Sequence, residues 1–109
     1  MKKFIVLYHA PVSFMEGMKN ASPEQSKKEM DSWMEWAKKC GSGLVDFGAP
    51  LMNGQKVTNS GSSPSEKNVV GYSILQADDM EKAQEMLKEH PHLNWRDGCE
   101  IEIHEVVKM

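Results

Sequence analysis

The chain lacks most of the features that would place it in a specialised class of protein. Its two cysteines, Cys40 and Cys99, lie far apart and belong to no CxxC or Cys/His spacing, so neither a zinc site nor a redox motif is indicated. Isolated cysteines of this kind are typical of a reducing compartment, and we expect a cytoplasmic protein. No apolar run is long enough to span a bilayer, so a membrane is not an expected partner.

The chain has no concentration of positive charge either. The formal net charge is -3 at pH 7, and the lysines are scattered among carboxylates instead of forming a basic stripe, which argues against nucleic acid as a partner. The four histidines, His9, His90, His92 and His104, have no ligand-like spacing on a helix or hairpin. The chain also has no GxSxG motif and no phosphate-binding glycine loop. We therefore predict neither a metal site nor a bound cofactor.

The remaining composition is that of an ordinary globular protein, with 39% hydrophobic and 27% charged residues. A chain of 109 residues can bury enough apolar surface to fold without disulfides or metal. We expect one domain that covers residues 1–109.

Four apolar runs predict strands, because they are short and rich in β-branched and aromatic residues. They cover Lys3–His9, Leu44–Phe47, Asn68–Gln76 and Gly98–Val107. In the last run, one predicted face carries Cys99, Ile101 and Ile103 and the other carries Glu100, Glu102 and His104. The first run is apolar on both faces, which is typical of a central strand.

Two helices are predicted between these strands. The first begins at Ser22, an N-cap residue followed by Pro23. Its expected apolar face consists of Met30, Trp33, Met34 and Ala37. Asp78 is the expected N-cap of the second helix, and Pro91 should stop it.

A hairpin is predicted after the second strand. Asn53-Gly54 is a favoured two-residue turn, and it separates Leu51-Met52 from the short run Gln55–Val57. The following segment, Asn59–Ser65, has almost no side chain to bury, so we expect it to be a mobile loop.

The element order is thus β, α, β with a hairpin, β, α, β. The right-handed crossover rule places both helices on one face of an antiparallel sheet, which is the α+β, ferredoxin-like, split βαβ arrangement. The opposite face then combines apolar residues of the first and third strands with the polar row of the fourth. Because a monomer would expose that mixed surface to water, we predict a homodimer formed by packing of two sheets.

Six short stretches together resemble the YCII-related family, including its DGPF-domain branch. They are Lys3–Tyr8, Val45–Pro50, Gly71-Tyr72, Gln76–Ala83, His90-Pro91 and Glu100–Ile103. The resemblance covers nearly the whole chain, and it implies a dimeric α/β barrel. The chain departs from the DGPF branch at Asn59–Ser62, which takes the place of the Asp-Gly-Pro-Phe loop.

The same resemblance implies a catalytic pair. The YCII branch has a histidine on its first helix and an aspartate before the proline that closes the second helix. The matching positions here are Asp31 and His90, so the two residue types are exchanged.

His90 is the strongest candidate catalytic residue, because an imidazole at a helix C-terminus beside a carboxylate can act as a general base. A structural role at the helix end is the alternative, and Asp31 has the ordinary interpretation of an exposed helix carboxylate. Tyr8 and His9 end the first strand, and Trp95 follows the second helix, where each can line a ligand pocket or simply pack in the core.

Two functions remain open. The first is a small-molecule enzyme in which His90, aided by Asp31, moves a proton in a pocket enclosed by the dimer barrel and the loop of residues 10–21. The second is a dimeric binding or regulatory module that holds a small ligand without reacting it. The exchanged pair and the missing DGPF loop favour the second function.

Overall fold

The computed structural model describes residues 1–11, 22–95 and 97–108. The elements in chain order are β1 (Lys2–His9), α2 (Pro23–Cys40), η1 (Gly41–Gly43), β2 (Leu44–Pro50), β3 (Gln55–Thr58), β4 (Gly61–Pro64), β5 (Val69–Ala77), α3 (Met80–Leu87), η2 (Pro91–Asn94) and β6 (Glu100–Glu105). None of the described helices has the length and apolarity needed to cross a membrane.

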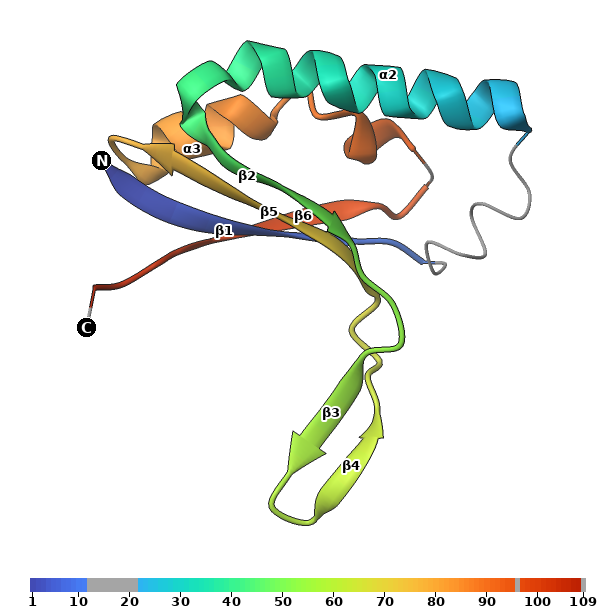
Figure 1. The fold of residues 1–109 in the computed structure, drawn as a ribbon. Helices are drawn as coiled ribbons and strands as arrows, with labels where there is room; N and C mark the ends of the chain where they lie inside the picture. The colour runs from blue at the N-terminus through green and yellow to red at the C-terminus, as the bar shows by residue number, and fades with distance from the viewer. Residues whose placement is uncertain (12–21, 96, 109) are drawn as a thin grey trace.

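The main sheet has the strand order β2-β5-β1-β6, and each neighbouring pair is antiparallel. Helices α2 and α3 both lie on the same side of this sheet (Figure 1). The crossover through α2 leads from β1 to β2, and the crossover through α3 leads from β5 to β6. Each crossover therefore passes over one central strand and covers the same face of the sheet. This arrangement confirms the predicted α+β, ferredoxin-like fold.

Strand register assigns each side chain to a face, because directly opposed residues point to the same side. Tyr8 is opposite Ile101, and Val6 is opposite Ile103, so these side chains all face the helices. The most deeply buried side chains on this helix side are Phe4, Val6, Tyr8, Ser73 and Leu75. The hydrophobic core thus lies between the sheet and the two helices.

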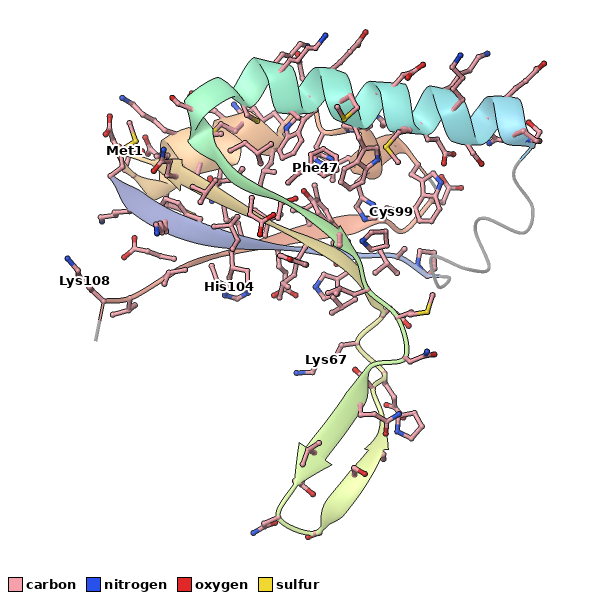
Figure 2. The ribbon with its side chains drawn as sticks, in the orientation of Figure 1. Met1, Phe47, Lys67, Cys99, His104 and Lys108 are labelled. Atoms are coloured by element: carbon pink, nitrogen blue, oxygen red, sulfur yellow. The ribbon has the colours of Figure 1, made fainter. Side chains whose placement is uncertain are left out.

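The other side of the sheet, which we call the uncovered face, has none of the described helices over it (Figure 1). Its centre is formed by half-buried apolar side chains from the two central strands, namely Ile5, Leu7, Tyr72 and Ile74. The polar row of β6 lies beside them, because Glu102 is opposite Leu7 and His104 is opposite Ile5. Figure 2 shows His104 on this side and Phe47 on the helix side. The predicted division of residues on the last strand is confirmed.

Helix α2 begins as predicted but presents a different face to the sheet. The Ser22 hydroxyl accepts a hydrogen bond from the Gln25 N–H at 3.1 Å, which confirms the N-cap. Trp36 is buried, whereas Met30 and Met34 are 58% and 50% exposed. The prediction that both methionines are core residues is therefore wrong. Compared with the predicted orientation, the helix is rotated about its axis so that the indole rings of Trp33 and Trp36 face the sheet. These rings bury more apolar area than the methionine side chains.

The N-cap of helix α3 is one residue later than the predicted N-cap, Asp78. Asp79 is the N-cap, and its carboxylate accepts from the Lys82 N–H at 2.9 Å. Asp78 instead pairs with the Lys82 ammonium at 3.3 Å. The cap prediction is wrong by one residue, because either aspartate is a suitable cap and the local pattern does not distinguish them.

The hairpin is present, but its turn lies elsewhere. β3 pairs with β4, and the chain reverses at Asn59-Ser60, where the Ser60 N–H donates to the Thr58 hydroxyl at 3.2 Å. Gly54 is part of the paired region, because its carbonyl accepts from the Ser65 N–H at 2.9 Å. The predicted turn at Asn53-Gly54 is therefore wrong. Much of the expected loop Asn59–Ser65 is strand β4, although it is fully exposed as expected.

Candidate functional site

Tyr8 begins a chain of hydrogen bonds that links three strands on the helix side of the sheet. Ser73 donates to the Phe47 carbonyl at 2.7 Å, and Tyr8 and Ser73 are joined by a 2.8 Å bond between their hydroxyl groups. Because a serine hydroxyl has one hydrogen, the Tyr8 hydroxyl must donate to Ser73. Burial raises the pKa of Tyr8 well above its usual value, an effect that the Ser73 bond only partly offsets. The phenol stays protonated and fixes β1 to β5 and β2.

His90 lies in the connection between α3 and η2 and is completely buried. Its Nδ1 accepts a hydrogen bond from the His92 N–H at 3.0 Å, so the proton of the neutral ring is on Nε2. No described residue accepts a hydrogen bond from that Nε2. The ring centroids of Trp33 and Trp36 lie 4.4 and 4.3 Å from the centroid of the imidazole. Both pairs have edge-to-face geometry, in which an N–H can point at an aromatic face.

The protonation state of His90 follows from this environment. Burial, assisted by the neighbouring His92, lowers the pKa of His90 to about 3. The ring is therefore neutral near physiological pH and is a weak proton acceptor there. The structure places His90 at the N-cap of η2, where it holds the turn that carries His92.

His92 is also buried, but it connects other elements. Its Nε2 donates to the His9 carbonyl at 2.8 Å, which ties η2 to the end of β1. Burial lowers the pKa of His92, and hydrogen bonding to the backbone of His9 and Glu100 acts in the opposite direction. The centroid of the His92 imidazole lies 5.2 Å from that of the Tyr8 ring and 6.0 Å from that of the Trp95 ring. His92 is thus a rigid part of the wall beside Tyr8.

These groups line a cavity of about 230 Å³ between α2 and the ends of β1, β2 and β5, which we call the aromatic pocket. The lining residues are Tyr8, Ser26, Glu29, Met30, Trp33, Phe47, Ala49, Pro50, Val70, Gly71, Tyr72, His92 and Trp95. Four of them, Tyr8, Trp33, Phe47 and Trp95, present Tyr, Trp or Phe rings on this side of the sheet, whereas the Tyr72 side chain belongs to the uncovered face. Because an apolar cavity of about 150 Å³ already holds benzene, this one can hold a ring with substituents.

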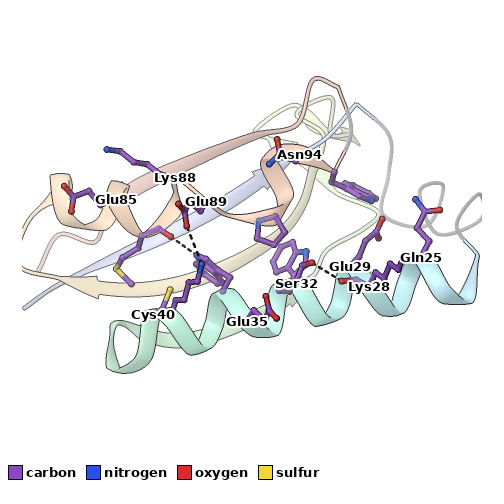
Figure 3. Close-up of a pocket in the computed structure, with 16 residues that line it drawn as sticks. Gln25, Lys28, Glu29, Ser32, Glu35, Cys40, Glu85, Lys88, Glu89 and Asn94 are labelled. Carbon is purple, nitrogen blue, oxygen red and sulfur yellow. Dashed lines mark hydrogen bonds and ion pairs between the residues drawn. The ribbon is translucent and has the colours of Figure 1, made fainter.

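A second, wider cavity separates α2 from α3 and η2 (Figure 3), and we call it the interhelical groove. It is open and rimmed by charged side chains of both signs, such as Lys39 and Glu89, which pair across it at 3.4 Å. Trp36 forms part of its wall and donates its indole N–H to the Met86 carbonyl at 2.7 Å. Open, hydrated charge pairs contribute little binding energy, so the aromatic pocket is the better ligand site.

The structure separates the two residues of the predicted catalytic pair. Asp31 is exposed on α2, and no hydrogen bond or ion pair joins it to His90 or to another described residue. His90 is adjacent to the aromatic pocket but lines neither cavity among the described residues. A catalytic role for the pair stays a prediction, and the structure provides no contact between its members.

The three predicted pocket residues have different positions. Tyr8 and Trp95 line the aromatic pocket. His9 lies on the uncovered face, because consecutive strand residues point to opposite sides. There its Nδ1 donates to the Lys67 carbonyl at 2.8 Å, and its Nε2 lies 3.3 Å from the Glu102 carboxylate. The part of the pocket prediction that involves residues 12–21 falls outside the described residues.

Sequence reasoning missed several residues that form the aromatic pocket. Trp33 was assigned to the core alone, and Glu29 and Phe47 were assigned no role. Glu29 and Trp33 are one helical turn apart, so they share a face of α2, and this spacing was visible in the sequence. The participation of Phe47 has no local signal, because it depends on how β2 lies against α2.

Fold and cavity together define the class of this protein: a ferredoxin-like α+β chain with an aromatic pocket between its longer helix and the sheet. No family model matches the chain, and no curated protein matches its sequence. A solved structure with a similar fold is 5-chloro-2-hydroxyhydroquinone dehydrochlorinase from Burkholderia phenoliruptrix, determined in complex with 2,5-dihydroxybenzoquinone. The similarity covers 94% of this chain and 91% of that chain, with 12% sequence identity and a TM-score of 0.51. At this identity the likeness shows the fold alone.

Proposed function

We propose that this protein binds a small, flat, largely apolar ring compound in the aromatic pocket. The observation that carries the proposal is the pocket itself, whose wall combines four aromatic side chains with the buried His92. Two of its polar wall groups are already occupied, since Tyr8 donates to Ser73 and His92 donates to the His9 carbonyl. In the deeper part of the pocket, binding therefore depends on shape and on apolar contact, which is usual for small-molecule sites.

Two methionines on one helix provide a matched test. Met30 lines the pocket, whereas Met34, one turn later, does not, and both are about half exposed. We expect neutral ring compounds such as indole or p-cresol to raise the melting temperature of the wild-type protein. Met30→Ala should weaken that binding several-fold by removing apolar contact, and Met34→Ala should leave it unchanged. Equal effects of the two substitutions, or no stabilisation by any ring compound, would exclude the pocket as the site.

The uncovered face supports a second element of the proposal, a homodimer. Its apolar centre, which no described element covers, consists of Ile5, Leu7, Tyr72 and Ile74. Packing two such faces about a two-fold axis removes this surface from water. A dimer of this kind agrees with the resemblance to the YCII-related family, and membership of that family is part of the same proposal.

An enzymatic role is the alternative, and the fold similarity favours it. The dehydrochlorinase acts on a hydroxylated ring and was solved with a ring compound bound, as its name and complex state. In such a role His90 is the proposed base and Asp31 its proposed partner. The test is release of chloride from a chlorinated hydroxyhydroquinone by the wild-type protein, by His90→Gln and by Asp31→Asn. Unchanged turnover in both variants would eliminate the pair as the catalytic group.

A further inference from the structure

One face of α2 contributes a polar edge to the aromatic pocket. Four residues with the spacing of a single helical face line the cavity, namely Ser26, Glu29, Met30 and Trp33. Glu29 is half-buried there, and Figure 3 shows its side chain extending from α2 toward the η2 side. Among the described lining residues it is the only one with a full charge, and none is a lysine or arginine.

The Glu29 carboxylate is not neutralised by any of the described residues around it. It makes no hydrogen bond or ion pair with another described residue. The positions one turn away on α2 are Gln25, Ser26, Ser32 and Trp33, so no lysine is within the usual helical reach. Among the described residues, a ligand in the pocket would therefore meet a single, unpaired negative charge.

The aromatic rings of the pocket, like the Glu29 carboxylate, favour a positively charged ligand. Trp33 and Trp95 line the pocket together with Tyr8 and Phe47, and the faces of such rings carry partial negative charge. A cation near these faces is stabilised, and an anion is repelled. A carboxylate in the pocket would in addition lose its hydration without gaining a cationic partner.

We propose that the ligand of the aromatic pocket is a small aromatic amine, with its ring between Trp33 and the sheet and its ammonium group at Glu29. This inference rests on the proposed ring-binding function and specifies the charge of the ligand. Both the unpaired carboxylate and the ring faces select a cation, whereas the size of the pocket restricts the ligand to one ring and a short arm.

The experiment compares three compounds that differ only in one end group: 2-phenylethylamine, 2-phenylethanol and 3-phenylpropanoate. Isothermal titration calorimetry on the full chain should show the amine binding about fivefold more tightly than the alcohol, and the carboxylate most weakly. The advantage of the amine should shrink at high salt, because part of it is a screened ion pair.

Two variants locate the effect. Glu29→Gln should reduce the amine-to-alcohol ratio to about one, and Glu29→Lys should reverse the preference toward the carboxylate. Glu35→Gln is the matched control, because it removes the same charge from α2 at a residue that lines only the interhelical groove. It should leave the ratio unchanged.

The outcomes separate this inference from the function on which it rests. If the alcohol binds but the amine has no advantage, or if Glu29→Gln and Glu35→Gln change the ratio equally, the charge preference is wrong and ring binding survives. If none of the three compounds binds, the proposed function itself fails, and the amine proposal fails with it.

Discussion

The two faces of the sheet are both apolar at their centres, but the described helices cover only one of them. On the helix side, Phe4, Val6 and Leu75 are completely buried beneath α2 and α3. On the uncovered face, Ile5 and Ile74 are only half-buried, and the Glu102 carboxylate lies between His9 and His104 beside them. The helix side therefore stabilises the chain and forms the aromatic pocket, and we propose that the uncovered face binds a second copy.

Substitution of one residue on each face should give the largest difference. Phe4→Ala removes a buried ring and should lower the free energy of unfolding by about 3–5 kcal/mol. The adjacent Ile5→Ala, on the uncovered face, should cost less than half of that in dilute solution, because its side chain is partly hydrated already. Urea denaturation of both variants measures the difference. Equal losses would show that the two faces do not differ in packing.

A charge on the uncovered face tests its role as an interface. Light scattering at micromolar concentration should give the wild-type protein twice the 12.3 kDa chain mass, and Ile74→Lys should return it to the mass of one chain. Val57→Lys introduces the same charge at a hairpin position that is 77% exposed, and it should leave the dimer intact. A wild-type mass near 12.3 kDa would refute the homodimer.

The buried histidines on the helix side should make stability depend on pH. His90 has a pKa near 3 in the folded protein and about 6.5 when unfolded, so below pH ~6.5 only the unfolded chain takes up this proton. Acidification therefore favours unfolding, by about 1.4 kcal/mol per pH unit between the two values. The lowered pKa of His92 acts in the same direction.

Replacement of His90 separates this effect from general acid denaturation. His90→Leu should be less stable near neutral pH, because the His92 N–H loses its acceptor, but its stability should fall less steeply as pH decreases. Urea midpoints at several pH values between about 7 and about 4.5 give both slopes. A variant slope as steep as that of the wild-type protein would mean that His90 is not the titrating group.

The division of the sheet into faces could be predicted because strand alternation is a local property. The last strand alternates strictly, and Ile101 and Ile103 face the helices as expected. Which face of α2 is buried could not be predicted in the same way. Met30, Met34 and Trp36 are all apolar residues, so the sequence alone does not show which of them face the sheet. Which side of the helix is buried depends on ring packing against the sheet, and that information is not local.

The candidate site was only partly predictable for the same reason. Tyr8 and Trp95 were named because strand and helix ends often carry ligand-contacting residues, and both line the aromatic pocket. The position of His90 before Pro91 indicated a special residue, but only the fold shows that the surrounding tryptophans exclude it from both cavities. Asp31 was carried over from the family resemblance by position along the chain, and such a correspondence does not determine which face of the helix a side chain occupies.

The three tryptophans allow the most direct measurement of ligand binding in the aromatic pocket. Trp33 and Trp95 line both cavities, whereas Trp36 lines only the interhelical groove and is bonded to the Met86 carbonyl. In a proton–nitrogen correlation spectrum of the ¹⁵N-labelled protein, titration with 2-phenylethanol should shift the indole signals of Trp33 and Trp95 while that of Trp36 stays nearly fixed. Three unchanged signals at saturating ligand concentration, or a shift of Trp36 as large as the other two, would contradict the proposal.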